Sequence, residues 1–222
     1  LAGLENGWLQ GEIAKARKAR TANIARRKDA LIGVSEFPLI DETMPALESV
    51  SAPARTATPT DFAERKISPA FEALPQWRAA ESFEKLRDKA DAAIAKGKKP
   101  AVFIAALGSV AENSARVQFT QNLLAAGGVS NVESAGDADI GAAFKASGLA
   151  AACICGSDAS YSTLAADTAK ALKAAGASWV ILAGKPGENE AALKEAGVDQ
   201  FIFAGLDAIA ALETVQAALG VE

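Results

Sequence analysis

Residues 101–128, AVFIAALGSVAENSARVQFTQNLLAAGG, decide the fold, because a buried-strand pattern passes through one glycine directly into an amphipathic helix. Residues 102–107 are continuously apolar, which is typical of a parallel strand covered on both faces. Gly108 ends that run, and Ser109 with Glu112 has the spacing of a capping box at a helix start. A strand, a glycine turn and a helix N-terminus together form the place where α/β proteins hold ligands.

The same strand-and-helix plan repeats to the end of the chain. Strand-like apolar runs begin near residues 101, 129, 150, 179 and 200, and helical patterns lie at 111–126, 138–147, 161–175, 189–196 and 208–219. Each interval fits one strand and one helix, which is the pattern of a parallel sheet. We therefore predict an α/β, flavodoxin-like fold, with a five-stranded parallel sheet of order 2-1-3-4-5 and helices on both faces. The first of these helices should bury Val117, Leu124 and either Phe119 or Leu123.

The pattern is different before this sheet. Residues 79–99 predict a helix. Its apolar face has spacings of three and four residues: Phe83, Leu86, Ala90 and Ile94. Residues 39–78 contain prolines at positions 45, 53, 59, 69 and 75, which favour an extended linker.

The first 38 residues combine a predicted helix at 5–28 with a predicted strand at 31–38. The helix has Trp8, Ile13 and Ile24 on its apolar side. Seven basic residues follow from position 15: Lys15, Arg17, Lys18, Arg20, Arg26, Arg27 and Lys28. These charges fit a contact with phosphate or nucleic acid, or a helix side that faces solvent or a partner. No aromatic residues are interleaved with them, so base stacking is not supported. A lone strand needs neighbours, so we expect the segment to belong to a larger domain whose beginning is missing.

Composition excludes several classes of chemistry. The chain has 222 residues, a net charge of −4 and no histidine, which excludes imidazole metal ligands and histidine-dependent triads. Cys153 and Cys155 alternate within a predicted strand, where they cannot bridge and are expected to be core residues. With no long apolar stretch and no disulfide framework, we expect a cytoplasmic protein without membrane or nucleic-acid partners.

Ligands on such a sheet bind at the carboxyl ends of the strands. Those ends are predicted at 108–109, 156–158, 183–185 and 204–206, and each contains glycine. A phospho-acceptor receiver would need an acidic pair after the first strand, where Leu107, Gly108 and Ser109 stand instead. A flavin site would need a Ser/Thr-rich phosphate loop, and SVAEN is a poor one. Ligand binding and ordinary strand-to-helix turns both remain open from these residues alone.

Several stretches resemble a known family. They are GVSEFP at 33–38, SPAFEALPQWRAAESFEKLRD at 68–88, VFIAALGSVAENSARVQFTQNLLAAGG at 102–128, CICGSDASYSTLAADTAKALKAAGA at 153–177, WVILAGKP at 179–186 and FIFAGLDA at 201–208. Together they resemble the C-terminal part of the small (beta) subunit of bacterial methylmalonyl-CoA mutase. The resemblance implies that 1–38 is the C-terminal remnant of a TIM-barrel domain, 39–78 a Pro-rich linker and 79–222 a cobalamin-binding-like domain. A start at Leu1 rather than Met fits a fragment or a processed product.

The resemblance also implies a degenerate cofactor site. Catalytic subunits of this family carry Asp-x-His-x-x-Gly after the first strand of the domain, where the His ligates cobalt and the Asp orients it. The matching positions in this sequence are Ser109, Ala111 and Ser114, so none of the motif is present. The loops that flank the nucleotide tail of cobalamin correspond to Cys155, Gly156 and Ser157 after the third strand and to Gly184 and Lys185 after the fourth. A lysine at 185 is expected to project into the groove of the tail.

The resulting functional prediction is a non-catalytic, structural chain. It has no catalytic residue, metal ligand or bound cofactor of its own. It forms a heterodimer with a large (alpha) catalytic subunit, which holds adenosylcobalamin and interconverts methylmalonyl-CoA and succinyl-CoA. One alternative is a domain that still binds cobalamin base-on, which needs no histidine, and another is a stand-alone flavodoxin-like interaction module.

Overall fold

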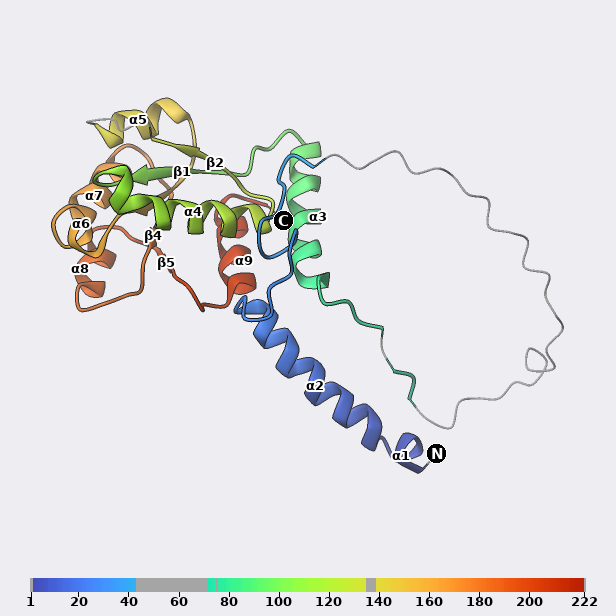
Figure 1. Ribbon diagram of the computed structural model, residues 1–222. Helices are drawn as coiled ribbons and strands as arrows, with labels where there is room; N and C mark the ends of the chain where they lie inside the picture. Colours follow the sequence, from blue (N-terminus) through green and yellow to red (C-terminus); the bar gives the residue numbers. More distant parts are fainter. Residues whose placement is uncertain (1, 43–71, 75, 135–138, 222) are drawn as a thin grey trace. The chain divides into compact units, whose positions relative to one another are not determined.

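The computed structural model describes residues 2–42, 72–74, 76–134 and 139–221 (Figure 1). The chain divides into two compact units. One comprises Leu1–Ala19 with Asp41–Trp77, and the other comprises Arg20–Ile40 with Arg78–Glu222. Most of the predicted linker at 39–78 lies outside the described residues.

A five-stranded parallel sheet forms the centre of the second unit. Its strands are β1 (Ala101–Ala106), β2 (Ser130–Glu133), β3 (Ala151–Cys155), β4 (Trp179–Ala183) and β5 (Gln200–Ile202). The order is β2-β1-β3-β4-β5 and every pairing is parallel. The predicted fold class, strand order and strand positions are therefore confirmed.

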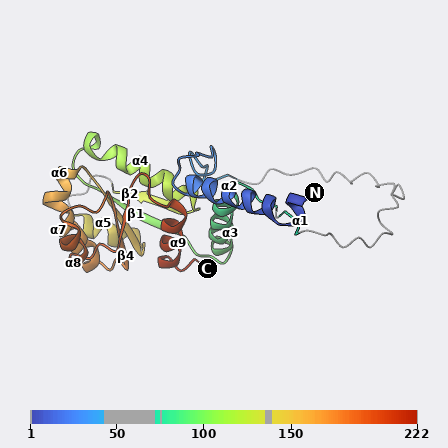
Figure 2. The same ribbon diagram turned by 90° about the horizontal axis from the view of Figure 1, so that it is seen from below.

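Helices cover both faces of this sheet. After β1 the chain forms α4 (Val110–Ala126), α5 (Ile140–Ser147), α6 (Asp158–Ser160), the π-helical turn η1 (Tyr161–Ala165), α7 (Ala166–Ala174), α8 (Glu190–Glu195) and α9 (Ala208–Ala218). Figure 2 shows α4 on one side of the strands and α7 and α8 on the other. Phe103, Ile154 and Leu182 face a core with Phe144 of α5 and Leu172 of α7. The alternate residues of these strands face α4, because successive side chains of a β-strand point to opposite faces of the sheet.

The α4 face settles an alternative that the sequence leaves open. Val117, Leu123 and Leu124 are buried, and Phe119 remains partly exposed. Cys155 Sγ lies 3.4 Å from Thr120 Oγ1 of α4 and 3.8 Å from Cys153 Sγ, with both thiols free and buried. The prediction that the two cysteines are unbridged core residues is confirmed.

Helix α3 (Glu81–Ala95) packs where α4 and α9 end near the amino-terminal edge of the sheet. It buries four residues: Phe83, Leu86, Ala90 and Ala93. Ile94, which the spacing assigns to the same face, is 51% exposed. In the last turn of the helix the buried position is Ala93 instead. A Cβ on Gly128, whose φ is +71°, would lie 2.6 Å from the Ala90 Cβ, so this glycine allows α3 to approach closely.

The predicted strand at 31–38 is wrong. The segment is a tight turn in which the amides of Val34, Ser35 and Glu36 all approach the Leu31 carbonyl at 2.9–3.2 Å. Only one isolated bridge forms, between Ile32 and Glu36. Gly33, with a φ of +79°, turns the chain back on itself, and the backbone amide of Phe37 then donates to Asn122 Oδ1 of α4 instead of joining a neighbouring strand.

The predicted helix at 5–28 is interrupted and ends earlier. It consists of α1 (Ala2–Glu5) and α2 (Trp8–Ala25), separated by Gly7 with a φ of +76°. Of the predicted apolar side only Ile24 is buried, while Trp8 and Ile13 are exposed. Among the described residues, no helix combines the length and the hydrophobicity needed to cross a bilayer.

Candidate functional site

The carboxyl ends of β1, β3 and β4 bring the sequence-predicted site residues to one edge of the sheet, as parallel pairing requires. Ser109, Ala111 and Ser114 lie at the start of α4, Gly156 and Ser157 follow β3, and Gly184 and Lys185 follow β4. These residues lie at the same edge of the sheet, as expected. Tyr161, which the sequence pattern does not single out, lies among them.

The start of α4 is closed by the predicted capping box. Oε2 of Glu112 accepts from the Ser109 backbone amide at 2.8 Å and from its hydroxyl at 2.7 Å. These two donors hold the pKa of the Glu112 carboxyl below its usual value. Ala111 is exposed on the first turn of α4, while Asn113 turns inward and its Nδ2 donates to the Leu107 carbonyl at 3.3 Å.

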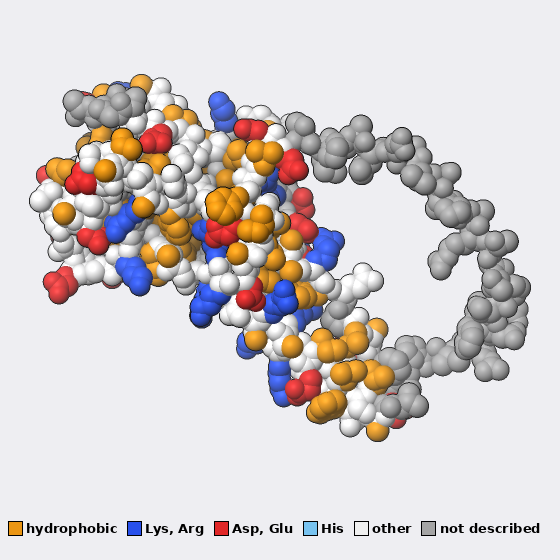
Figure 3. All heavy atoms as spheres, viewed as in Figure 1, with side chains coloured by type: hydrophobic (Ala, Val, Ile, Leu, Met, Phe, Trp, Pro, Cys, Tyr) orange, Lys and Arg blue, Asp and Glu red, His pale blue; other side chains and the backbone are white. Residues whose placement is uncertain are grey.

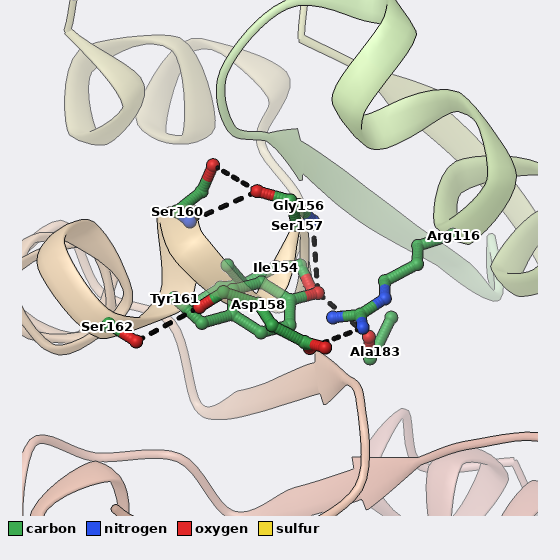
Figure 4. Close-up of polar contacts among 9 residues, drawn as sticks. All are labelled: Arg116, Ile154, Gly156, Ser157, Asp158, Ser160, Tyr161, Ser162 and Ala183. Carbon is green, nitrogen blue, oxygen red and sulfur yellow. Dashed lines mark hydrogen bonds and ion pairs between the residues drawn. The ribbon is translucent and has the colours of Figure 1, made fainter.

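Tyr161 fills the space between the carboxyl ends of β3 and β4 (Figure 4). Its hydroxyl oxygen accepts from the Gly156 amide at 3.0 Å. Its single proton has two acceptors in reach, the Ala183 carbonyl at 2.8 Å and the Ile154 carbonyl at 3.2 Å. The phenol hydroxyl therefore forms hydrogen bonds with backbone groups at the carboxyl ends of both β3 and β4.

The ring of Tyr161 is held on both edges and on one face. A Cβ built on Gly156 would lie 3.3 Å from Cε1, and a Cβ built on Gly184 would lie 3.0 Å from Cε2. The guanidinium of Arg116 lies 4.8 Å from the ring centroid and is paired with the carboxylate of Asp158. Glycine at 156 and 184 is therefore explained by the close approach of this ring.

Burial raises the pKa of the Tyr161 phenol, so it is a neutral hydrogen-bonding group and not a general base near neutral pH. The chain contains one tyrosine, so tyrosinate absorbance reports on Tyr161 alone. We expect the folded chain to show almost no tyrosinate at a pH near the ordinary value of 10.0. In denaturant the midpoint should return to about 10.

The raised pKa of the Tyr161 phenol determines how the stability of the fold depends on pH. The contribution of this phenol to folding is complete below about pH 10 and is lost as the pH rises toward the value of the folded state. Tyr161→Phe should make alkaline unfolding less dependent on pH in this range. A spectroscopic midpoint near 10 in the folded chain would contradict the buried hydrogen bonds.

Lys185 lies beside this cluster. Its side chain is exposed, and its Nζ lies 6.0 Å from the centroid of the Phe203 ring after β5. An open cavity of about 570 Å³ adjoins both residues and also borders Arg116, Asp158 and Gly184. The slot next to Gly184 is filled by Tyr161, and the expected obstruction of a cofactor groove by Lys185 stays a prediction.

No protein-family model matches the chain. Over an alignment of 225 residues it is 40% identical to the methylmalonyl-CoA mutase small subunit of Streptomyces virginiae, covering 100% of this chain and 33% of that protein. It is 35% identical over 220 residues to the probable methylmalonyl-CoA mutase small subunit of Mycobacterium bovis, covering 96% of this chain and 31% of the relative.

The methylmalonyl-CoA mutase small subunit of Propionibacterium freudenreichii subsp. shermanii is 31% identical over 229 residues, covering 100% of this chain and 33% of the relative. This chain is homologous to part of the methylmalonyl-CoA mutase small subunit. It spans about a third of the length of these relatives. The resemblance expected from the sequence motifs is thereby confirmed.

Two properties of the side chains in this small-subunit homologue bear on its chemistry. No group of three or more His, Cys, Asp or Glu side chains that could hold a metal occurs in the part of the chain that the structure describes. The Cys153 thiol is enclosed by the sheet and α4, and this burial raises its pKa well above the ordinary value. A protonated, inaccessible thiol and a neutral phenol are poor nucleophiles.

The role of Tyr161 is not visible in the local sequence. Its backbone acceptor on Ala183 lies 22 residues away along the chain, so no local spacing reveals the contact. One usable signal is present, because the only tyrosine of the chain follows two serines and an aspartate directly after β3. Buried tyrosine hydroxyls need a partner, and backbone groups at the ends of strands provide one.

Proposed function

We propose that this chain is a non-catalytic, structural part of an adenosylcobalamin-dependent methylmalonyl-CoA mutase. The isomerisation of methylmalonyl-CoA and succinyl-CoA takes place on a large partner subunit, which also holds the cofactor. The naming of three relatives as methylmalonyl-CoA mutase small subunits supports the assignment to this enzyme. The absence of histidine from the whole sequence supports a chain without a cobalt ligand of the imidazole type.

The occupied slot between β3 and β4 is the observation that carries this proposal. The resemblance assigns Gly156 and Gly184 to the walls of the tail groove, and a Cβ built on either would lie 3.0–3.3 Å from opposite edges of the Tyr161 ring. Ala111, at the position of the cobalt ligand, is exposed on a capped helix. The residues present therefore do not fit cobalamin, and we assign no step of the reaction to this chain.

A visible spectrum of the purified chain, recorded with and without cobalamin and after removal of unbound cofactor, tests this proposal. We expect no retained cobalamin absorbance. Retained absorbance without imidazole coordination would support the base-on alternative instead. Co-purification with a large mutase subunit distinguishes the proposed function from a stand-alone interaction module.

An exposed apolar patch, defined as Ile32, Phe37 and Leu39, supports a role in binding a partner chain. Phe37 is 77% exposed and has a φ of +51°, which is uncommon for phenylalanine. The Asn122 side chain of α4 holds this conformation: its Oδ1 accepts from the Phe37 amide at 2.8 Å, and its Nδ2 donates to Glu36 at 2.7 Å. Arg27 pairs with Glu36 at 2.7 Å. An exposed aromatic ring on a fixed, strained backbone is suited to protein recognition.

Phe37→Asp is expected to weaken association with the large subunit by about tenfold or more, because it replaces an apolar contact by a charge that must be desolvated. Pull-down or analytical ultracentrifugation of the reconstituted subunits measures this effect. Val110→Asp is the matched control, since Val110 is 78% exposed at the start of α4. Unchanged association of the Phe37 variant would exclude the patch from the interface.

We further propose that the assembled enzyme is cytoplasmic. A chain of 222 residues with two cysteines has no disulfide framework, and this composition supports a reducing compartment. The net charge of −4 gives no reason to propose nucleic acid as a partner.

A further inference from the structure

We propose that backbone groups at the carboxyl ends of β3 and β4 form a binding slot for planar phenols. The side chain of Tyr161 occupies this slot. Removing the side chain leaves a site that takes up a free phenol from solution. This inference goes beyond the proposed function, since it concerns the binding chemistry of this domain by itself.

The slot has the polar anchoring of a ligand site. At its inner end the Gly156 amide is a donor, and the carbonyls of Ala183 and Ile154 are acceptors, all within 3.2 Å of the hydroxyl oxygen. The two carbonyls belong to β3 and β4, and the amide belongs to the loop that follows β3. One hydroxyl both accepts and donates there, which an apolar occupant cannot do.

The walls of the slot fit a flat ring. Gly156 and Gly184 leave space on the two edges, and the Arg116 guanidinium covers one face at 4.8 Å from the centroid. Asp158 pairs with Arg116 and so fixes the position of this cation above the ring. The edge of the sheet is also the place where parallel α/β domains bind ligands.

Tyr161 reaches this slot from a helical turn that is itself irregular. The residue opens η1, a π-helical turn of five residues between α6 and α7. Ser157 caps the preceding turn by accepting from the Ser160 amide at 3.1 Å, so the backbone before Tyr161 is fixed (Figure 4). Irregular π turns of this kind are frequent at functional sites. The phenol thus lies in the slot as a ligand would, although it is attached to the chain.

The test uses the full chain with Tyr161→Gly and p-cresol, which is the free form of the tyrosine side chain. We expect the variant to melt about 10 °C below the parent. p-Cresol at about ten times its dissociation constant should raise the melting temperature of the variant by about 4 °C and that of the parent by far less. Toluene, which lacks the hydroxyl, should bind the variant about tenfold more weakly than p-cresol.

Phe144→Ala is the matched control. Phe144 is buried in the apolar core, where its ring packs edge-on against Phe103 at 5.7 Å between centroids. Its cavity should prefer toluene over p-cresol, because no polar groups anchor a hydroxyl there. A folded Tyr161→Gly variant that binds neither compound, or that prefers toluene, would overturn the proposal.

A second variant keeps the test decisive should Tyr161→Gly fail to fold. Tyr161→Phe keeps the ring and removes only the hydroxyl. We expect amide hydrogen exchange at Gly156, which donates to that hydroxyl, to become about tenfold faster. The Leu107 amide, which donates to the Cys155 carbonyl at 2.7 Å, should exchange as in the parent. Unchanged exchange at Gly156 would show that the hydroxyl is not anchored in the slot.

Discussion

Replacing Gln216 by leucine is expected to lower the free energy of unfolding by about 3 kcal/mol, because it removes two hydrogen bonds to buried carbonyl groups. The Gln216 side chain is 2% exposed, and its Nε2 donates to the Leu86 carbonyl at 2.7 Å and to the Gly127 carbonyl at 2.9 Å. Leu86 belongs to α3 and Gly127 ends α4, so one amide on α9 joins three helices. Leucine preserves the volume and removes only the hydrogen bonds.

Urea denaturation measures this loss as a lower midpoint with an unchanged slope. The matched control is Thr214→Val on the same helix, where an exposed hydroxyl donates to the Ala210 carbonyl at 2.9 Å. That change should cost less than about 0.5 kcal/mol. A loss for Gln216→Leu as small as for the control would show that α3 is attached mainly by its apolar face.

The second large effect concerns the degenerate cobalamin site that we propose for this chain. The triple change Ser109→Asp, Ala111→His and Ser114→Gly is expected to leave the chain unable to bind cobalamin, although it restores every residue of the family motif. The capped start of α4 places position 111 on an exposed helical turn. The slot that the proposed function assigns to the tail groove remains filled by Tyr161.

Adding Tyr161→Gly to the triple variant should therefore produce detectable cobalamin uptake, since an opened slot can accept a planar ring. The visible spectrum measures uptake and also reports imidazole coordination to cobalt. Adding Leu164→Ala instead, at an exposed residue of the same π turn, should have no effect. Adding Lys185→Gly should improve binding further if the lysine reaches into the groove. Tight binding by the triple variant alone would mean that the groove is open despite Tyr161.

Local pattern was sufficient for much of this fold. The continuous apolar runs predict every strand start to within a residue, and the observed β1, β3 and β4 begin at Ala101, Ala151 and Trp179. The Ser109–Glu112 spacing predicts the closed start of α4. Each of these features depends on residues that are close in sequence, where periodicity and capping act directly.

Features that depend on contacts between distant segments were not predictable in this way. Residues 31–38 have the composition of a strand, but Gly33 reverses the chain and the side chain of Asn122, 85 residues beyond Phe37, holds the turn. Ile94 has the right spacing for burial and is exposed, because the position of α3 on the domain decides which face is covered. Register and packing, which pattern alone does not contain, decide both cases.

The sequence by itself determined the α/β class, the strand order and the absence of an imidazole ligand, because hydrophobic periodicity, connection length and composition are properties of the chain. Only the tertiary structure decided what occupies the carboxyl edge of the sheet. In the sequence, Tyr161 is a single polar aromatic residue in a serine-rich segment. In the structure, β3 and β4 bring the Gly156 amide and the Ala183 carbonyl to its hydroxyl. A buried hydroxyl needs hydrogen-bond partners, and parallel pairing of strands that are distant in sequence brings these backbone groups together.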